Sequence, residues 1–203
     1  MLVSAYNKKG LKDVLVIMLA QTEPNKQVSE SKGQITQVKN EETNEVVGYN
    51  FFGISEELSG LENGPVVLTE EQVATLNAML EKVGFEVLLT ADESPKFVVG
   101  EVKKCEPVKD SDHLNLTETL VDNDETLQIV CGASNIAAGQ KVVVAKVGAI
   151  MPDGMVIWPG ELKGIKSYGM VCSAKELGVA EGSETKGILV LPEDSVVGSV
   201  FQG

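Results

Sequence analysis

Residues 129–154, IVCGASNIAAGQKVVVAKVGAIMPDG, and residues 161–178, ELKGIKSYGMVCSAKELG, decide the fold of this chain of 203 residues. Glycines stand where turns are expected, between short runs of β-branched residues. Polar side chains gather near these turns, and they are Asn135, Lys163, Lys166, Ser167 and Ser173. The pattern predicts a small closed barrel with a polar patch on one rim, and that patch is the first place to look for function.

The surrounding sequence extends this barrel to residues 95–203. Five short β-rich segments are separated by Gly, Asp or Asn turns, and they are KFVVGEVKKCEPV (96–108), LNLTETLVD (114–122), ETLQIVCG (125–132), QKVVVAKVGAIM (140–151) and YGMVCS (168–173). Brief helical pieces are expected at SNIAAG and AKELG. Together these segments predict an all-β Greek-key barrel with short helices, for which the OB fold is the leading candidate.

Residues 1–94 predict a separate small α/β (α+β) domain, to which the sequence assigns no role. The polar segment ADESP, residues 91–95, ends in proline and places the domain boundary there. A helix is expected from Thr69, because Gln72 completes a capping box, and Gly84 would end it. The expected strands are VLVIMLA (14–20), a hairpin of GQITQVKN (33–40) and EVVGYNFFGI (45–54), and FEVLLT (85–90).

Charge argues against a nucleic-acid binder. Thirty acidic residues against 17 basic ones, all lysine, give a net charge of −13. Residues 1–94 hold 7 lysines and 15 acidic residues, and residues 95–203 hold 10 and 15, so neither half is basic. Proteins that bind polyanions usually show a basic excess. If this chain binds RNA, it must do so through a local group of lysines.

The remaining composition indicates a cytoplasmic protein without a catalytic centre. No apolar run approaches the roughly 20 residues that span a bilayer, and the N-terminus does not resemble a signal peptide. Three cysteines without a CxxC pair predict reduced thiols. With His113 as its single histidine, the chain offers no paired motif for nucleophilic, metal or phosphate chemistry, so neither an enzyme nor a cofactor is expected.

From Phe97 to Phe201 the chain resembles the tRNA-binding OB domain of the bacterial phenylalanyl-tRNA synthetase β subunit, the methionyl-tRNA synthetase C-terminus and endothelial monocyte-activating polypeptide II-like proteins. The segments that carry the resemblance occur in the same order, and they are VGEVKKCEP, SDHLNL, LQIVCGASNIAAGQKV, VGAIMPDG, ELKGIKSYGMVCSAKELG and GILVLPED. The whole chain, leader included, resembles the YtpR-like tRNA-binding proteins of Gram-positive bacteria.

The resemblance implies a non-catalytic protein of translation that binds tRNA by shape, through backbone contacts. The RNA-binding residues that it implies are Asn135, Lys146, Lys163, Lys166, Ser167, Gly169, Met170, Ser173 and Lys175. An aminoacyl-tRNA synthetase or another translation protein is an expected partner, and a homo-oligomer is the expected state. The alternative roles are caps or turns for the asparagine and the serines, and core packing for the methionine.

Two departures from the family bear on the strength of binding. The His-Pro that commonly follows the first strand is absent, because this stretch reads VKDSDHL, and Leu-Arg-Gly is replaced by LKG at residues 162–164. Lysine keeps the charge but loses the planar fork that grips phosphate. A second hypothesis is therefore a protein-interaction or chaperone-like module that has kept the barrel and lost RNA. Trp158 could stack on a base or pack against an apolar edge.

Overall fold

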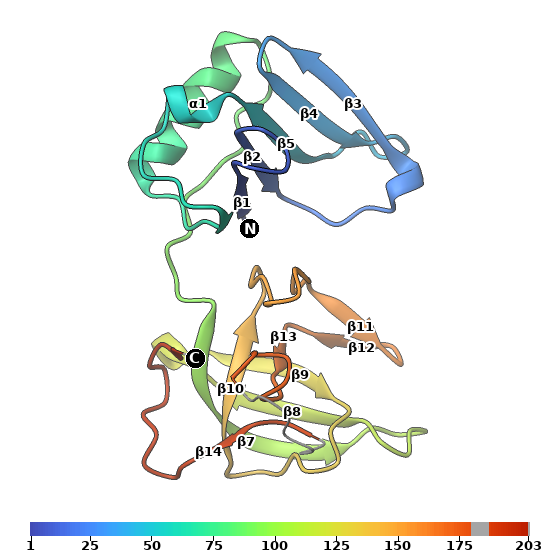
Figure 1. The fold of residues 1–203 in the computed structure, drawn as a ribbon. Coiled ribbons are helices and arrows are strands. Elements are labelled where there is room, and N and C mark those ends of the chain that lie inside the picture. Colours follow the sequence, from blue (N-terminus) through green and yellow to red (C-terminus); the bar gives the residue numbers. More distant parts are fainter. Residues whose placement is uncertain (180–186, 203) are drawn as a thin grey trace. The chain divides into compact units, whose positions relative to one another are not determined.

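The computed structural model describes residues 1–179 and 187–202, and the chain divides into two compact units, Met1–Ser94 and Pro95–Gly203 (Figure 1). The division lies inside the polar ADESP segment. Both units consist mainly of antiparallel strands, and the described residues contain one α-helix, α1 (Glu70–Lys82), which lies in the first unit. No helix in the described ranges is long and apolar enough to cross a membrane.

The first unit contains a six-stranded antiparallel sheet in the order β3-β4-β5-β2-β1-β6. Its strands are β1 (Val3–Asn7), β2 (Val14–Met18), β3 (Gln27–Lys32), β4 (Ile35–Asn40), β5 (Val46–Phe52) and β6 (Gly64–Pro65). Short 3-10 turns, η1 (Pro24–Lys26) and η2 (Ile54–Glu56), join the elements. The predicted strand at residues 14–20 and the predicted hairpin are confirmed as β2 and as the β4–β5 pair.

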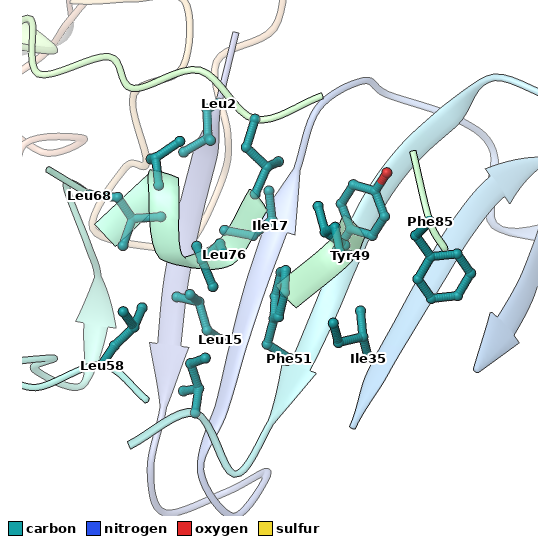
Figure 2. Packing of buried hydrophobic residues seen from close by; sticks show 14 of the residues in the cluster. Leu2, Leu15, Ile17, Ile35, Tyr49, Phe51, Leu58, Leu68, Leu76 and Phe85 are labelled. Atoms are coloured by element: carbon teal, nitrogen blue, oxygen red, sulfur yellow. The ribbon is translucent and has the colours of Figure 1, made fainter. Parts of the chain in front are cut away.

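One face of this sheet packs against α1 and forms the core (Figure 2). Alternating sheet residues such as Leu15, Ile17 and Phe51 meet the helix residues Leu76 and Leu80, and all of them are at most 1% exposed. This is the arrangement expected when a strand of period two and a helix of period 3.6 share one apolar face.

The predicted capping box of α1 is confirmed. The Thr69 hydroxyl accepts a hydrogen bond from the Gln72 amide at 3.2 Å, and the Gln72 side chain accepts one from the Thr69 amide at 3.1 Å. Gly84 follows the helix with φ at 70°. A positive φ of this kind is typical of the residue just beyond a helix.

The predicted strand FEVLLT is wrong, because residues 85–90 form no regular element. Their polar backbone groups are satisfied by side chains instead. The side chain of Asn77 donates a hydrogen bond to the Leu89 carbonyl through its Nδ2 and accepts one from the Leu89 backbone amide through its Oδ1. The Tyr49 hydroxyl donates to the Glu86 carbonyl at 2.7 Å. Phe85 and Leu89 are buried in the core, whereas Val87 and Leu88 are exposed, and β3 and β6 form the edges of the sheet.

The second unit is a nearly closed barrel, whose main sheet has the order β13-β10-β7-β8-β9 (Figure 1). Its strands are β7 (Phe97–Pro107), β8 (Asn115–Leu120), β9 (Thr126–Cys131), β10 (Lys141–Lys146), β13 (Gly169–Val171) and β14 (Val190–Leu191), which pairs with β10. The five predicted β segments supply the five strands of the main sheet. The predicted fold class, a small α+β unit followed by an all-β OB barrel, is confirmed.

Two local expectations for the barrel need correction. SNIAAG and AKELG form turns rather than helices, and the described part of this unit also contains the irregular 3-10 turn η3 (Asp122–Asp124). A single bond from the Leu177 amide to the Ser173 carbonyl has helical spacing, which is too little to nucleate a helix. A short hairpin formed by β11 (Gly160–Leu162) and β12 (Ile165–Ser167) was not predicted from the sequence.

We expect Thr69→Ala to destabilise α1 by about 1 kcal/mol, because the substitution removes the N-terminal cap. Hydrogen exchange of the α1 amides measures this loss locally, without requiring the two units to unfold together. The matched control is Thr75→Ala, which removes a hydroxyl that donates to the Glu71 carbonyl within the same helix. Alanine favours helix there, so this control should be neutral. Equal loss of protection in both variants would contradict the role of the cap.

Candidate nucleic-acid interface

Residues 166–168, which form the end of β12 and its connection to β13, close the barrel by bonding to β9. The Tyr168 amide donates to the Gln128 carbonyl at 2.8 Å, and the Val130 amide donates to the Ser167 hydroxyl at 3.1 Å. The Gln128 side chain donates to the Lys166 carbonyl at 2.7 Å. Ser167 is 6% exposed, so the structure places this predicted contact residue inside the seam that joins β9 to the rest of the barrel.

The β11–β12 hairpin stands out from the barrel as a separate two-stranded sheet (Figure 1). Lys163 and Gly164 form its two-residue turn, with φ at 53° and 78°. Positive φ at both central residues defines a type I′ turn, in which Asn-Gly and Asp-Gly are favoured. The chain places a lysine at the first of these positions instead, and its side chain is exposed at the tip.

The hairpin is anchored to the loop between β7 and β8. Ile165 packs against a small apolar cluster of Val108, Leu114 and Val130, in which the first two residues belong to that loop. In chain order, the loop connects the first and second strands of the barrel sheet, β7 and β8. The hairpin lies between the fourth and fifth strands, β10 and β13. In OB folds these two connections flank the surface that binds oligonucleotides. We call residues 108–114 together with residues 161–168 the hairpin rim.

The predicted lysines fall into two groups. Lys163 and Lys166 lie on the hairpin, and Lys175 lies on the turn after β13; all three are exposed and form no ion pair within the described ranges. Lys146 differs, because its ammonium lies 2.8 Å from both carboxylate oxygens of Asp122. The two side chains are 12% and 9% exposed. The charge of Lys146 is therefore neutralised inside the protein.

The side chains of the predicted polar residues Asn135 and Ser173 both form hydrogen bonds within the barrel unit, the first to a distant residue and the second to a near neighbour. The side chain of Asn135 donates to the Ile188 carbonyl at 3.0 Å through its Nδ2 and accepts from the Ile188 backbone amide at 2.9 Å through its Oδ1. These two bonds join two distant segments. The Ser173 hydroxyl donates to the Glu176 carboxylate at 2.6 Å and accepts from the Glu176 amide. The Ser173 bonds match its capping alternative, whereas Asn135 links two segments instead of capping a turn.

Gly169 and Met170 lie in β13, where the barrel is closely packed. Gly169 has φ at 149°, and a Cβ there would lie 3.0 Å from the Ala145 carbonyl oxygen and 3.3 Å from Ile129. The close approach that requires glycine is therefore between strands. Met170 packs against the buried cluster that includes Val143 and Cys172, in agreement with the core alternative.

Sequence reasoning overlooked two residues of the hairpin rim. Tyr168 is 39% exposed, and it lies between the buried Ser167 and the strand glycine. Lys109 is exposed in the loop between β7 and β8, beside the apolar cluster that anchors the hairpin. The alternation of side chains along a strand could have identified Tyr168, because an inward Ser167 turns its neighbour outward. Trp158 is half-buried.

The cysteines and the histidine form no reactive centre in the described part of the chain. Burial raises the pKa of the Cys172 thiol to about 12 and also raises the pKa of Cys105 and Cys131. Such thiols stay protonated at neutral pH and are poor nucleophiles. His113 is exposed, and its Nδ1 lies 2.7 Å from the Asp112 carboxylate. The described residues contain no group of three side chains that could hold a metal ion.

Two family models match the chain. Residues 97–200 match the model described as "Putative tRNA binding domain". Residues 22–92 match the model described as "Domain of unknown function (DUF4479)". The first match covers the barrel, and the second covers most of the α+β unit.

Several known proteins are similar to the chain. It is 47% identical over 197 residues to the "Putative tRNA-binding protein YtpR" of Bacillus subtilis, and the match covers 97% of this chain and 98% of that protein. It is 43% identical to the phenylalanine–tRNA ligase β subunit of Oceanobacillus iheyensis over 73% of this chain, but spans 18% of that subunit. A solved structure of a MetRS related protein from Pyrococcus horikoshii is 23% identical, with a TM-score of 0.40, over 52% of this chain and 88% of that one.

We expect Asp122→Asn to destabilise the barrel by about 3 kcal/mol, because it leaves the Lys146 ammonium buried without its counter-charge. Urea unfolding followed by the fluorescence of Trp158 measures this, since the single tryptophan lies in the barrel unit. Asp124→Asn is the matched control, because it removes the same charge from an exposed position of the same turn. If the two variants unfold at the same urea concentration, the ion pair does not stabilise the barrel.

Proposed function

This chain belongs to the tRNA-binding domain family, and on that premise we propose that it is a non-catalytic protein that binds tRNA through the hairpin rim of its barrel. The contacts are to phosphates and ribose hydroxyls, so the shape of the RNA is recognised rather than its sequence. Lys163 and Lys166 supply the central charges, with Lys109 beside them. Tyr168 offers an exposed ring on which a base or a ribose can lie.

The conformation of Lys163 is the observation that carries this proposal. A residue with a side chain in the left-handed region costs roughly 1 kcal/mol or more, and such strain is concentrated at functional sites. An asparagine or a glycine would relieve it. The lysine instead holds an unpaired charge at the outermost point of the hairpin. Ile165 packs against the apolar cluster and Gln128 donates a hydrogen bond to the Lys166 carbonyl, and both contacts hold the base of the hairpin in place. The charge of Lys163 is therefore presented by an ordered hairpin.

The arrangement of ion pairs in the barrel supports the same surface. Among the described residues of the barrel, the lysines already paired with carboxylates include Lys103, Lys104, Lys141 and Lys146. The exposed lysines of the hairpin rim have no such partner among the described residues. An incoming phosphate would therefore meet cations that need not first break a protein ion pair. Because all the cations are lysines in an acidic unit, binding should be of modest affinity and should weaken steeply with salt.

We further propose that the protein acts in translation in the cytoplasm, beside an aminoacyl-tRNA synthetase. The phenylalanine–tRNA ligase β subunits among its relatives support this, since they contain a region similar to most of this chain. A homo-oligomer fits the apolar exposure of the barrel unit. Val196 and Val200 are 70% and 55% exposed, and a second copy could cover them.

We expect Lys163→Gln/Lys166→Gln to raise the Kd of the full chain for deacylated tRNA about tenfold at about 50 mM salt, because two phosphate contacts are lost. The slope of log K against log salt should become shallower by about 1.5. The matched control is Lys103→Gln/Lys104→Gln, which removes the same charge from lysines that lie 2.9 Å and 2.8 Å from glutamates. Filter binding or fluorescence anisotropy measures both.

Two results would overturn the proposal. If both double variants lose the same affinity, total charge rather than the hairpin rim governs binding. If the unmodified protein forms no complex at micromolar concentration in about 50 mM salt, the chain is not a tRNA binder. Protein partners that remain after ribonuclease treatment would then favour the protein-interaction alternative.

A further inference from the structure

The loop that joins β1 to β2 is a basic segment in an acidic unit. Its six residues 8–13 read KKGLKD and hold three of the seven lysines of residues 1–94 but one of the 15 acidic residues, Asp13; the first five are Lys8–Lys12. All five are exposed. Lys8, Lys9 and Lys12 form no ion pair among the described residues, whereas Lys26 and Lys32 of the same unit each contact a glutamate.

The backbone of this loop is held in place at both ends. The Asn7 side chain accepts hydrogen bonds from the amides of Gly10 and Leu11 at 2.7 Å and 3.0 Å. The Lys8 amide donates to the Asn63 side chain at 3.0 Å. At the other end, the Asp13 carbonyl accepts from the Gly53 amide at 2.8 Å. The lysines therefore project from an ordered loop, which reduces the entropy lost when they bind a ligand.

The carboxylate of Asp13 at the end of the loop forms no ion pair with these lysines among the described residues, although the charge of Lys8 helps to lower its pKa. The side chain of Asp13 accepts hydrogen bonds from the Ser55 hydroxyl at 2.7 Å and from the Tyr6 hydroxyl at 2.9 Å. The bond from Ser55 is the main cause that holds the pKa of Asp13 below its ordinary value. Its oxygens are thus occupied by neutral donors. Lys12 and Asp13 both have positive φ, at 58° and 64°, so the loop also keeps a lysine in a strained conformation.

We propose that the loop Lys8–Lys12 is a second RNA-contact surface, which binds the phosphate backbone of the same tRNA that the barrel holds. The inference rests on the proposed function of the barrel and gives the α+β unit a role in it. Three unpaired lysines on an ordered support fit a run of phosphates. They fit an anionic membrane less well, because Leu11, 56% exposed, is the single apolar side chain of the loop.

The test compares two double variants of the full chain that carry the same charge change in the same unit. Lys8→Gln/Lys9→Gln removes two cations from the loop. Lys39→Gln/Lys82→Gln removes two cations, one from β4 and one from α1. Neither lysine forms an ion pair within the described residues. We expect the loop variant to raise the Kd for tRNA about fivefold at about 50 mM salt and to flatten the salt slope by about 1.5. The control should change the Kd less than about twofold.

A third variant tests the order of the loop. Asn7→Ala keeps every lysine but removes the side chain that holds Gly10 and Leu11. We expect weaker tRNA binding with an unchanged salt slope, because the number of phosphate contacts is the same while the loop must be ordered on binding. An affinity equal to that of the unmodified protein would contradict this use of Asn7.

The outcomes separate the two proposals. If the unmodified protein binds tRNA and the loop variant matches the control, the loop is not an RNA contact, and the function of the barrel stands. If the unmodified protein binds no tRNA, the function of the barrel fails and the inference fails with it. If the loop variant loses sedimentation with phosphatidylserine vesicles while its tRNA affinity is unchanged, the loop binds anionic membranes, and the inference is overturned.

Discussion

Closure of the barrel is the constraint on which the interface depends. An open sheet exposes unpaired backbone groups along its edge strands, and closure removes that exposure. Here β9, which pairs with β8 in the sheet, is also joined to residues 166–168 by the hydroxyl of Ser167, the amide of Tyr168 and the side chain of Gln128. Because the chain must bring residues 166–168 onto β9, the preceding hairpin is held at its base. The exposed lysines of the hairpin take their position from that seam.

The sequence predicts those parts of the fold that depend on near neighbours. The capping box of α1 is a contact over three residues, and each barrel strand is a short β-rich run bounded by turn residues. The strand predicted at FEVLLT was wrong because the backbone of Leu89 is hydrogen-bonded by the side chain of Asn77, which lies twelve residues away in α1. A β-rich composition predicts an extended segment, and it does not say whether a strand or a side chain will satisfy the backbone.

The candidate site was harder to predict for the same reason. The motif gathers polar residues, and only their distant partners separate structural from exposed side chains. Asn135 is bonded to Ile188, 53 residues away, and Lys146 to Asp122, 24 residues away. These side chains stabilise the barrel that presents the others. A motif of this kind therefore identifies the family and the fold together, and the exposed subset of its residues is visible only in the structure.

Net charge is a poor guide to binding when the cations are segregated. At physiological salt an exposed charge is screened beyond about 8 Å, so a phosphate responds to the lysines that it touches more than to the total of −13. The acidic remainder still matters, because it offers an RNA no favourable contact away from the lysines. Under the proposed function, binding is then restricted to ligands that reach the basic surfaces. In the proposed binding mode, such contacts would discriminate RNAs by shape without any reading of bases.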